Sequence, residues 1–337
     1  MASTFETLTS EFITTRARVV GSAIRLPNIF DRRGFSGARP GTLRANTTDD
    51  SQLLAFTTSL AEWRGFAANQ AAEGLALGLA EEPLPVNIWL DTQMAIHAET
   101  RNSGSWGRAA TVAAGIDYLF SDNLLAGVMV QGDWLDDTSD DGIVSGTGVL
   151  VGPYVSIALA ENVSFDATVL YGGSSNTASS TVFGEDFSGD FETTRLYAKA
   201  SLTGEFNVDA LIVRPNATFF LASERAGDYT VANASGDVVA IAGTDLLQYR
   251  LTVGSKFEYA IELDNGAVLT PLLGLNVGFT GSDITGQENT QAFLGELTLG
   301  FEYRSEAGFK IGAEARGEMA SDGFSSVGLR ATISGQF

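Results

Sequence analysis

The residue with the most evident chemical potential is His97, the single histidine among 337 residues. In the run NIWLDTQMAIHAE it alternates with Asp91, Gln93 and Glu99, so a strand would place these polar side chains on one face. A histidine beside carboxylates can act in general acid–base catalysis, and with a serine it can act in a hydrolase. No G-x-S-x-G motif accompanies it, and the chain has no cysteine. We therefore expect a hydrogen-bonded structural histidine, no catalytic residue and no enzymatic activity.

A second group of chemically capable side chains consists of acids and bases that alternate with apolar residues. The carboxylates are Asp91, Asp117, Asp133, Glu258 and Glu314, and the bases are Arg195, Lys199, Arg250, Lys256, Arg316 and Arg330. Residues two apart share one face of a strand, so these groups would point into a common interior. The pattern predicts ion pairs that hold neighbouring elements together, each contributing at most about 1 kcal/mol where it is exposed.

Cofactor and metal motifs are absent from the sequence. The 38 glycines include no G-x-x-x-x-G-K-[ST] phosphate loop. The acidic segments DDTSDD (136–141) and GEDFSGDFE (184–192) lack the D-x-D-x-D-G pattern of a calcium loop. One histidine and no cysteine leave little for a transition-metal site. We expect a solvated acidic rim, with no cofactor and no metal.

Composition narrows the class of protein further. The 41 acidic and 20 basic residues leave a net charge of −21, which disfavours nucleic acid as a partner. The hydrophobic fraction of 44% is too high for a disordered chain. No segment contains the 18 or so uninterrupted apolar residues of a membrane-spanning helix. A transmembrane β-barrel escapes this test, because it distributes its apolar surface over alternate positions of short strands.

The hydrophobic period is two from Pro85 to the last residue. In LLAGVMVQGDWL, Val128 and Val130 oppose Gln131 and Asp133, and the same alternation recurs in about twelve runs of strand length. Short connections near 120–123, 159–163, 206–209, 263–266 and 304–308 interleave with longer polar ones near 100–107, 136–142, 174–190, 224–236 and 281–290. Short turns at one rim and long loops at the other are typical of an outer-membrane barrel.

Aromatic residues gather at the ends of these runs, as in the interfacial girdles of a barrel. Tyr118, Phe120, Trp134, Tyr259 and Tyr303 are examples. The sequence therefore predicts an all-β fold, an antiparallel transmembrane β-barrel of about twelve strands. A soluble all-β fold with alternating faces is the alternative.

The segment before Pro85 has a different organisation. Apolar residues recur at helical spacing from Thr4 to Leu26, and the polar face of this helix includes Arg16, Arg18 and Arg25. About 20 residues give a helix of roughly 30 Å, long enough to thread the barrel, where these arginines would meet the inward carboxylates. We expect three regions: a pore helix and the start of a linker (1–34), a linker or helical segment (35–85), and the barrel (86–337).

Five segments carry a resemblance to a known family. They are FITTRARVV, NIWLDTQ, AAGIDYLFSDNLLAGVMVQGDW, GEFNVDALIVRPNATFFL and the ending LRATISGQF. In these the chain resembles the C-terminal translocator (β-domain) of classical autotransporters, the type V secretion proteins. The resemblance covers residues 86–337 well and the preceding part less, since about 50 residues separate the helix from the first strand.

The resemblance implies a domain of the bacterial outer membrane that assists export of an N-terminal passenger and anchors it at the cell surface. It also implies outer-membrane lipids, the passenger, the barrel-assembly machinery and periplasmic chaperones as partners of a monomer. Phe337 would belong to the signal for barrel assembly. The start, MASTFETLTSEF, is no secretory signal, so we expect a signal peptide outside this sequence.

Two alternatives remain open at this stage. Some resembling autotransporters cleave their own pore helix with acidic residues in the lumen, and Asp91, Asp117, Asp133, Glu258 and Glu314 are the corresponding candidates here. The other alternative is a free-standing outer-membrane channel or adhesin that acts through its extracellular loops.

Overall fold

The N-terminal segment forms helix α1 (Ala2–Ala23) in the computed structural model of the chain, which describes residues 1–29, 44–45, 56–59, 85–99, 106–264, 266–304 and 310–334. Its buried stripe includes Phe5, Phe12 and Val20, at the spacing of one helical face. The helix ends before Ile24, which is extended, and Pro27 could not donate the next backbone hydrogen bond.

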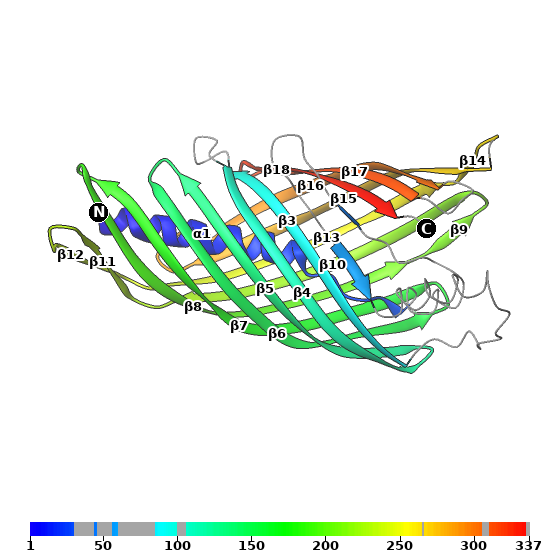
Figure 1. Cartoon of the computed structure of the whole chain (residues 1–337), viewed down its shortest axis with the longest axis horizontal. Helices are drawn as coiled ribbons and strands as arrows, with labels where there is room; N and C mark the ends of the chain where they lie inside the picture. Colours follow the sequence, from blue (N-terminus) through cyan, green and yellow to red (C-terminus); the bar gives the residue numbers. More distant parts are fainter. Residues whose placement is uncertain are drawn as a thin grey trace.

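Twelve long strands follow in the part of the chain that the structure describes. They are β3 (Val86–Glu99), β4 (Trp106–Ser121), β5 (Leu124–Ser139), β6 (Gly142–Ala160), β7 (Val163–Val182), β8 (Glu185–Gly204), β10 (Leu211–Ala226), β13 (Thr244–Tyr259), β15 (Val268–Ile284), β16 (Thr290–Arg304), β17 (Lys310–Ala320) and β18 (Phe324–Ser334). Each pairs antiparallel with the next in this order. The strands wrap around α1, which runs along the axis of the barrel (Figure 1).

Short strands extend this sheet at its two ends. They are β9 (Phe206–Val208), β11 (Tyr229–Asn233), β12 (Val238–Ile241) and β14 (Ile261–Glu262). The hairpin of β11 and β12 lies at the end of the barrel where α1 begins, and β9 and β14 lie at the opposite end (Figure 1). We call these the β11–β12 end and the β9–β14 end.

The first and last long strands meet at one place. Phe324 and Ser325 of β18 pair with Glu99 and Ala98 of β3. Farther along, β18 pairs with β1 (Arg44–Ala45) and β3 pairs with β2 (Phe56–Ser59). These two segments belong to the predicted linker or helical segment 35–85, and residues 46–55 and 60–84 of it lie outside the described residues.

Two connections that the sequence suggested as long loops are strands instead. Residues 174–182 continue β7 and residues 185–190 begin β8, joined by Phe183 and Gly184. Both turn residues have positive φ, 57° and 84°, as a two-residue hairpin requires. In the same way β5 and β6 meet at Ser139 and Gly142. The polar composition misled the loop assignment, because small polar residues can pair by their backbones in a hairpin beyond the membrane.

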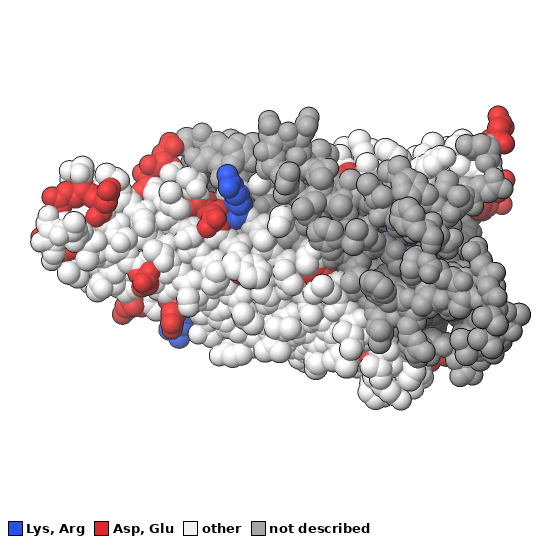
Figure 2. Space-filling view, in the orientation of Figure 1, with Lys and Arg blue, Asp and Glu red and all other residues white. Residues whose placement is uncertain are grey.

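Alternate residues of the long strands face opposite sides. Val128, Val253 and Val277 are outward and about half exposed, whereas Leu125, Met129 and other inward residues are buried. On the face seen in Figure 2, acidic residues gather toward the β11–β12 end, and the described surface next to them is almost entirely uncharged. Among the described residues, no helix is long and apolar enough to cross a bilayer.

Candidate functional site: the seat of the helix in the lumen

Helix α1 packs against the inner surface of the barrel, the lumen. Phe5, Phe12 and Ile13 are fully buried there. The ring of Phe12 meets that of Phe191 on β8 edge-on, with centroids 6.4 Å apart. Gly21 allows the helix to approach Phe220 on β10, because a Cβ at this position would overlap the phenyl ring. Part of the lumen is therefore apolar where it touches the helix.

A buried polar cluster fixes the middle of the helix. The Arg16 guanidinium donates hydrogen bonds to Ser174 Oγ at 2.5 Å and to Asn176 Oδ1 at 2.7 Å. Its Nε lies 3.3 Å from Asp133 Oδ1, and its Nη1 lies 3.7 Å from Glu224 Oε1. Arg16 thus joins strands β5, β7 and β10 through one side chain.

The second cation of this cluster is Arg195 on β8. Its Nη2 donates to Asp133 Oδ2 at 2.8 Å and to the Gly173 carbonyl at 2.9 Å. Glu224 in turn accepts hydrogen bonds from Thr193 Oγ1 at 2.8 Å and from Tyr197 Oη at 3.0 Å.

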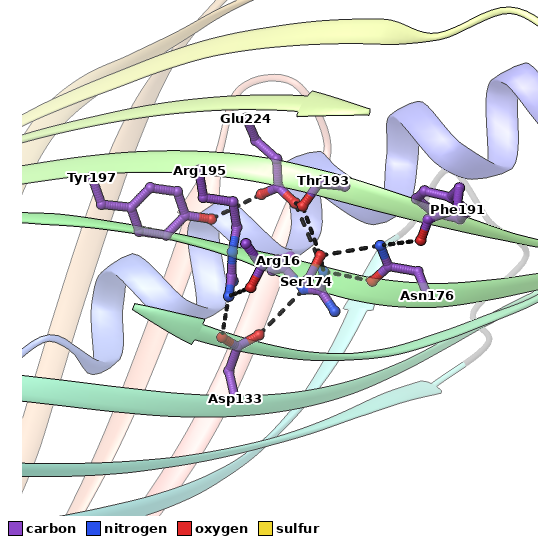
Figure 3. A network of polar contacts seen from close by, with 10 residues as sticks. Arg16, Asp133, Ser174, Asn176, Phe191, Thr193, Arg195, Tyr197 and Glu224 are labelled. Atoms are coloured by element: carbon purple, nitrogen blue, oxygen red, sulfur yellow. Dashed lines mark hydrogen bonds and ion pairs between the residues drawn. The ribbon is translucent and has the colours of Figure 1, made fainter. Parts of the chain in front are cut away.

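Figure 3 shows the convergence of these side chains on the helix. We call Arg16, Asp133, Ser174, Asn176, Thr193, Arg195, Tyr197 and Glu224 the Arg16 network. Its four ionic side chains are 0 to 1% exposed and their formal charges cancel. Paired charges of this kind are tolerated away from water, whereas removal of one partner leaves a buried charge.

Two glycines of β6 make room for the network. A Cβ at Gly146 would overlap Arg16 and Asn176, and a Cβ at Gly148 would overlap the Arg195 guanidinium. The absence of a side chain at these positions lets two guanidinium groups lie against the strand.

Contacts also hold the two ends of the N-terminal segment. Near the β11–β12 end, Thr9 Oγ1 lies 2.8 Å from Tyr229 Oη. Past the middle of the helix, Arg18 forms an ion pair of 2.9 Å with Asp322. Beyond the helix, Asn28 Nδ2 donates to Asp166 Oδ2 at 2.9 Å, and the Ile29 amide donates to Ser156 Oγ at 2.8 Å.

A separate polar group lies on β3, β4 and β6. The Trp89 indole donates to Tyr154 Oη at 2.6 Å, and Tyr154 donates to Asp117 Oδ2 at 2.9 Å. Asn87 Nδ2 also contacts this carboxylate, at 3.2 Å. Asp91 is 5% exposed on the same face of β3. Asp117 therefore accepts hydrogen bonds from an amide and a hydroxyl. These bonds give the carboxylate a structural role in the lumen.

The remaining predicted bases lie on the other side of the helix or near the β9–β14 end. Arg250 donates two hydrogen bonds of 3.0 Å to Glu318, and Arg316 pairs with Glu296. Lys256 lies 3.0 Å from Glu258 and 3.6 Å from Glu314.

Of the other predicted residues, Arg25 is exposed just beyond the end of α1. The backbone of His97 pairs with Gly107, and that of Arg330 pairs with Glu314. Phe337 lies outside the described residues.

Sequence reasoning missed Glu224, Tyr197 and the two glycines of β6. Glu224 fell in a stretch interpreted as a loop, and Tyr197 was an aromatic among apolar residues. The signal for both was the phase of β8 and β10, which places Tyr197 two positions from Arg195 and pairs Arg195 with Glu224. In the described ranges, no group of three or more His, Cys, Asp or Glu is placed to hold a metal ion.

Comparisons with known proteins agree with this architecture. The family model described as "Autotransporter beta-domain" matches residues 95–316. Among solved structures, the β-domain of the Bordetella autotransporter BrkA is 17% identical, with a TM-score of 0.54 over 74% of this chain and 98% of that one. The translocator domain of NalP from Neisseria meningitidis is 14% identical, with a TM-score of 0.50 over 82% and 95%.

At such identities the two structures establish the fold, and they confirm the predicted twelve-stranded barrel with its N-terminal helix. No curated protein sequence matches the chain. The family model, however, spans well over half of the chain. This chain belongs to the autotransporter β-domain family, and its role is that of a translocator domain of the bacterial outer membrane.

Proposed function

We propose that α1 is the tether by which this domain holds an exported passenger at the cell surface. The observation that carries the proposal is the direction of the helix inside the barrel. α1 begins at the β11–β12 end and runs toward the β9–β14 end, and the Arg16 network holds it in between (Figure 1). A passenger joined ahead of residue 1 would leave the barrel at the β11–β12 end.

The two ends of the barrel differ in the way that this orientation requires. Long hairpins in bacterial outer-membrane barrels face outward and short turns face the periplasm. The hairpins β7–β8 and β11–β12 extend the β11–β12 end, and turns such as 122–123 and 161–162 close strands at the other. The proposal therefore assigns the β11–β12 end to the cell exterior.

The same proposal names the partners of the domain. The outward apolar residues would contact outer-membrane lipids, and the barrel-assembly machinery and periplasmic chaperones would deliver a monomer to the membrane. A signal peptide upstream of this sequence would direct export to the periplasm. The domain would fold in the membrane and hold the passenger through α1, without catalysing a reaction. The buried carboxylates of the Arg16 network support this role, because cations and hydroxyl groups already bind them.

A reporter fusion tests the proposal. A signal peptide and a small folding-competent reporter are placed ahead of residue 1, and accessibility of the reporter to protease is measured in intact bacteria. The expected result is a cell-surface reporter that stays attached to the membrane fraction. A matched fusion without residues 86–337 is expected to remain in the periplasm.

The opposite result would contradict the export role. If the barrel is folded in the outer membrane and the reporter remains periplasmic, the domain acts as a free-standing channel or adhesin. Release of a reporter with the helix cut from the barrel would instead show self-cleavage and contradict the permanent tether.

A further inference from the structure

A polar cavity lies beside α1, on the side of the lumen opposite the Arg16 network's strands β5 to β7. Its volume is about 170 Å³, and its walls come from α1, β8, β10, β13, β15, β16 and β17. A buried water requires only about 15 Å³ in this measure, so the cavity can hold a small ion together with several waters.

The lining of this cavity carries an excess of positive charge. Its ionic side chains are Arg18, Lys199, Arg250, Arg316, Glu296 and Glu318, four cations and two carboxylates. This balance contrasts with the net charge of −21 for the whole chain. A local reversal of sign inside a membrane barrel favours an anionic occupant.

Three of the four cations have a carboxylate partner. Arg250 contacts Glu318 at 3.0 Å, Arg316 pairs with Glu296, and Arg18 contacts Asp322. The fourth cation, Lys199, donates from Nζ to the carbonyl of Ile24 at 2.6 Å. No ion pair formed within the described residues includes Lys199. A half-buried ammonium without a counter-charge is costly, which an anion in the cavity would offset.

The second group in the wall is a buried amide. Gln248 is 1% exposed and lines the cavity, and within the described ranges neither its Nε2 nor its Oε1 has a hydrogen-bond partner. Strand register places it near the lysine: Lys199 pairs with Phe220, Phe220 pairs with Arg250, and Gln248 is the next inward residue of β13. An amide donor and an ammonium donor thus border one hollow.

We propose that this cavity binds a small inorganic anion, held by the Lys199 ammonium and the Gln248 amide. A tetrahedral oxyanion such as sulfate or phosphate accepts several hydrogen bonds at once and could bridge both donors. Because the same ammonium also holds the Ile24 carbonyl at the end of α1, the bound anion stabilises the seat of the helix. This inference rests on the lumen alone and is independent of passenger export.

The test uses the full chain in detergent, with sodium sulfate as the probe. The melting temperature is followed as sulfate replaces sodium gluconate at constant ionic strength, and calorimetric titration gives the stoichiometry. The expected result is a saturable rise in melting temperature with one sulfate per chain. In Lys199→Gln the affinity for sulfate falls by about tenfold or more, the equivalent of 1.4 kcal/mol per tenfold.

Lys256→Gln is the matched control, because Lys256 is paired with Glu258 and Glu314 and does not line the cavity. It should bind sulfate as the wild-type chain does. Gln248→Leu is the second variant should Lys199→Gln fail to fold, and it too should bind sulfate more weakly. A wild-type chain without saturable binding, or equal binding by the wild type and the cavity variant, would overturn the proposal. Those results would mean that water molecules bind the Gln248 amide and that water, or loss of a proton from Lys199, removes the need for an anion.

Discussion

At the scale of single residues, the seat of the helix depends on one arginine whose neighbours are widely separated in sequence. Arg16 reaches Asp133, Ser174, Asn176 and Glu224, and its side chain is 0% exposed. A surface ion pair contributes at most about 1 kcal/mol, whereas breaking a buried one costs several times more. The value of Arg16 therefore lies in the charge balance of the Arg16 network, because without it one buried guanidinium, that of Arg195, would face two buried carboxylates.

Replacing this arginine should weaken the protein strongly. We expect Arg16→Met to lower the free energy of unfolding by about 3–5 kcal/mol, because Asp133 and Glu224 lose a cation away from water. Arg18→Met on the same helix removes a partly exposed pair with Asp322 and should cost about 1 kcal/mol or less. Chemical unfolding of both variants in detergent measures the difference. Equal losses would mean that the Arg16 network does not anchor the helix.

The sequence allowed the charges to be assigned to faces but not to partners. Alternation placed Asp133 and Arg195 on the polar faces of their strands, and the structure brings them to 2.8 Å. The pairing itself could not be read from the pattern, because it depends on how four strands and the helix meet in space. The role of Arg16 as the central residue, rather than Arg18 or Arg25, also required the rotation of the helix in the lumen.

At the scale of elements, each strand has a face toward lipid and a face toward the lumen, and neighbouring residues lie on opposite faces. Val277 on β15 is 62% exposed on the outer surface, and Asn276 beside it donates to Glu296 in the lumen at 2.9 Å. Because the strand period is two, the two neighbours meet opposite surroundings. The period of two was the strongest signal in the sequence, and it led to the correct number of long strands.

A pair of lysine substitutions tests this assignment of faces. Val277→Lys should destabilise the barrel in lipid by about 2–4 kcal/mol, because it places a charge near the middle of the apolar band. Asn276→Lys should cost far less, since the new ammonium lies next to Glu296. Unfolding in urea from lipid vesicles gives both values. A larger loss for the lumen variant than for the lipid variant would reverse the faces.

Element boundaries at the rim were harder to predict than the strands themselves. Residues 174–190 are polar and were expected to form a loop, but they pair residue by residue as the ends of β7 and β8. Small polar side chains occupy even the inward, buried positions of this hairpin, such as Ser174, Asn176 and Ser180. Polarity therefore could not separate a projecting hairpin from a loop.

At the scale of the whole molecule, the barrel and its helix form one assembly whose lumen is divided by the helix. One side is filled by apolar contacts and the Arg16 network, and the other contains the cation-lined cavity. The sequence indicated a helix long enough to thread the barrel, and the structure confirms it, with bounds shifted to Ala2–Ala23. The unequal filling of the lumen could not be foreseen, because it depends on side-chain volume on every strand.

The central claim is that α1 occupies the lumen and obstructs it. The most direct measurement is the ion conductance of single molecules in planar lipid bilayers, compared between the full chain and a variant without residues 1–29. The strands do not need the helix for backbone pairing, so the variant should still insert and should show a several-fold larger conductance with a lower melting temperature. Identical conductance in the two proteins would place the helix outside the conducting path and contradict the account.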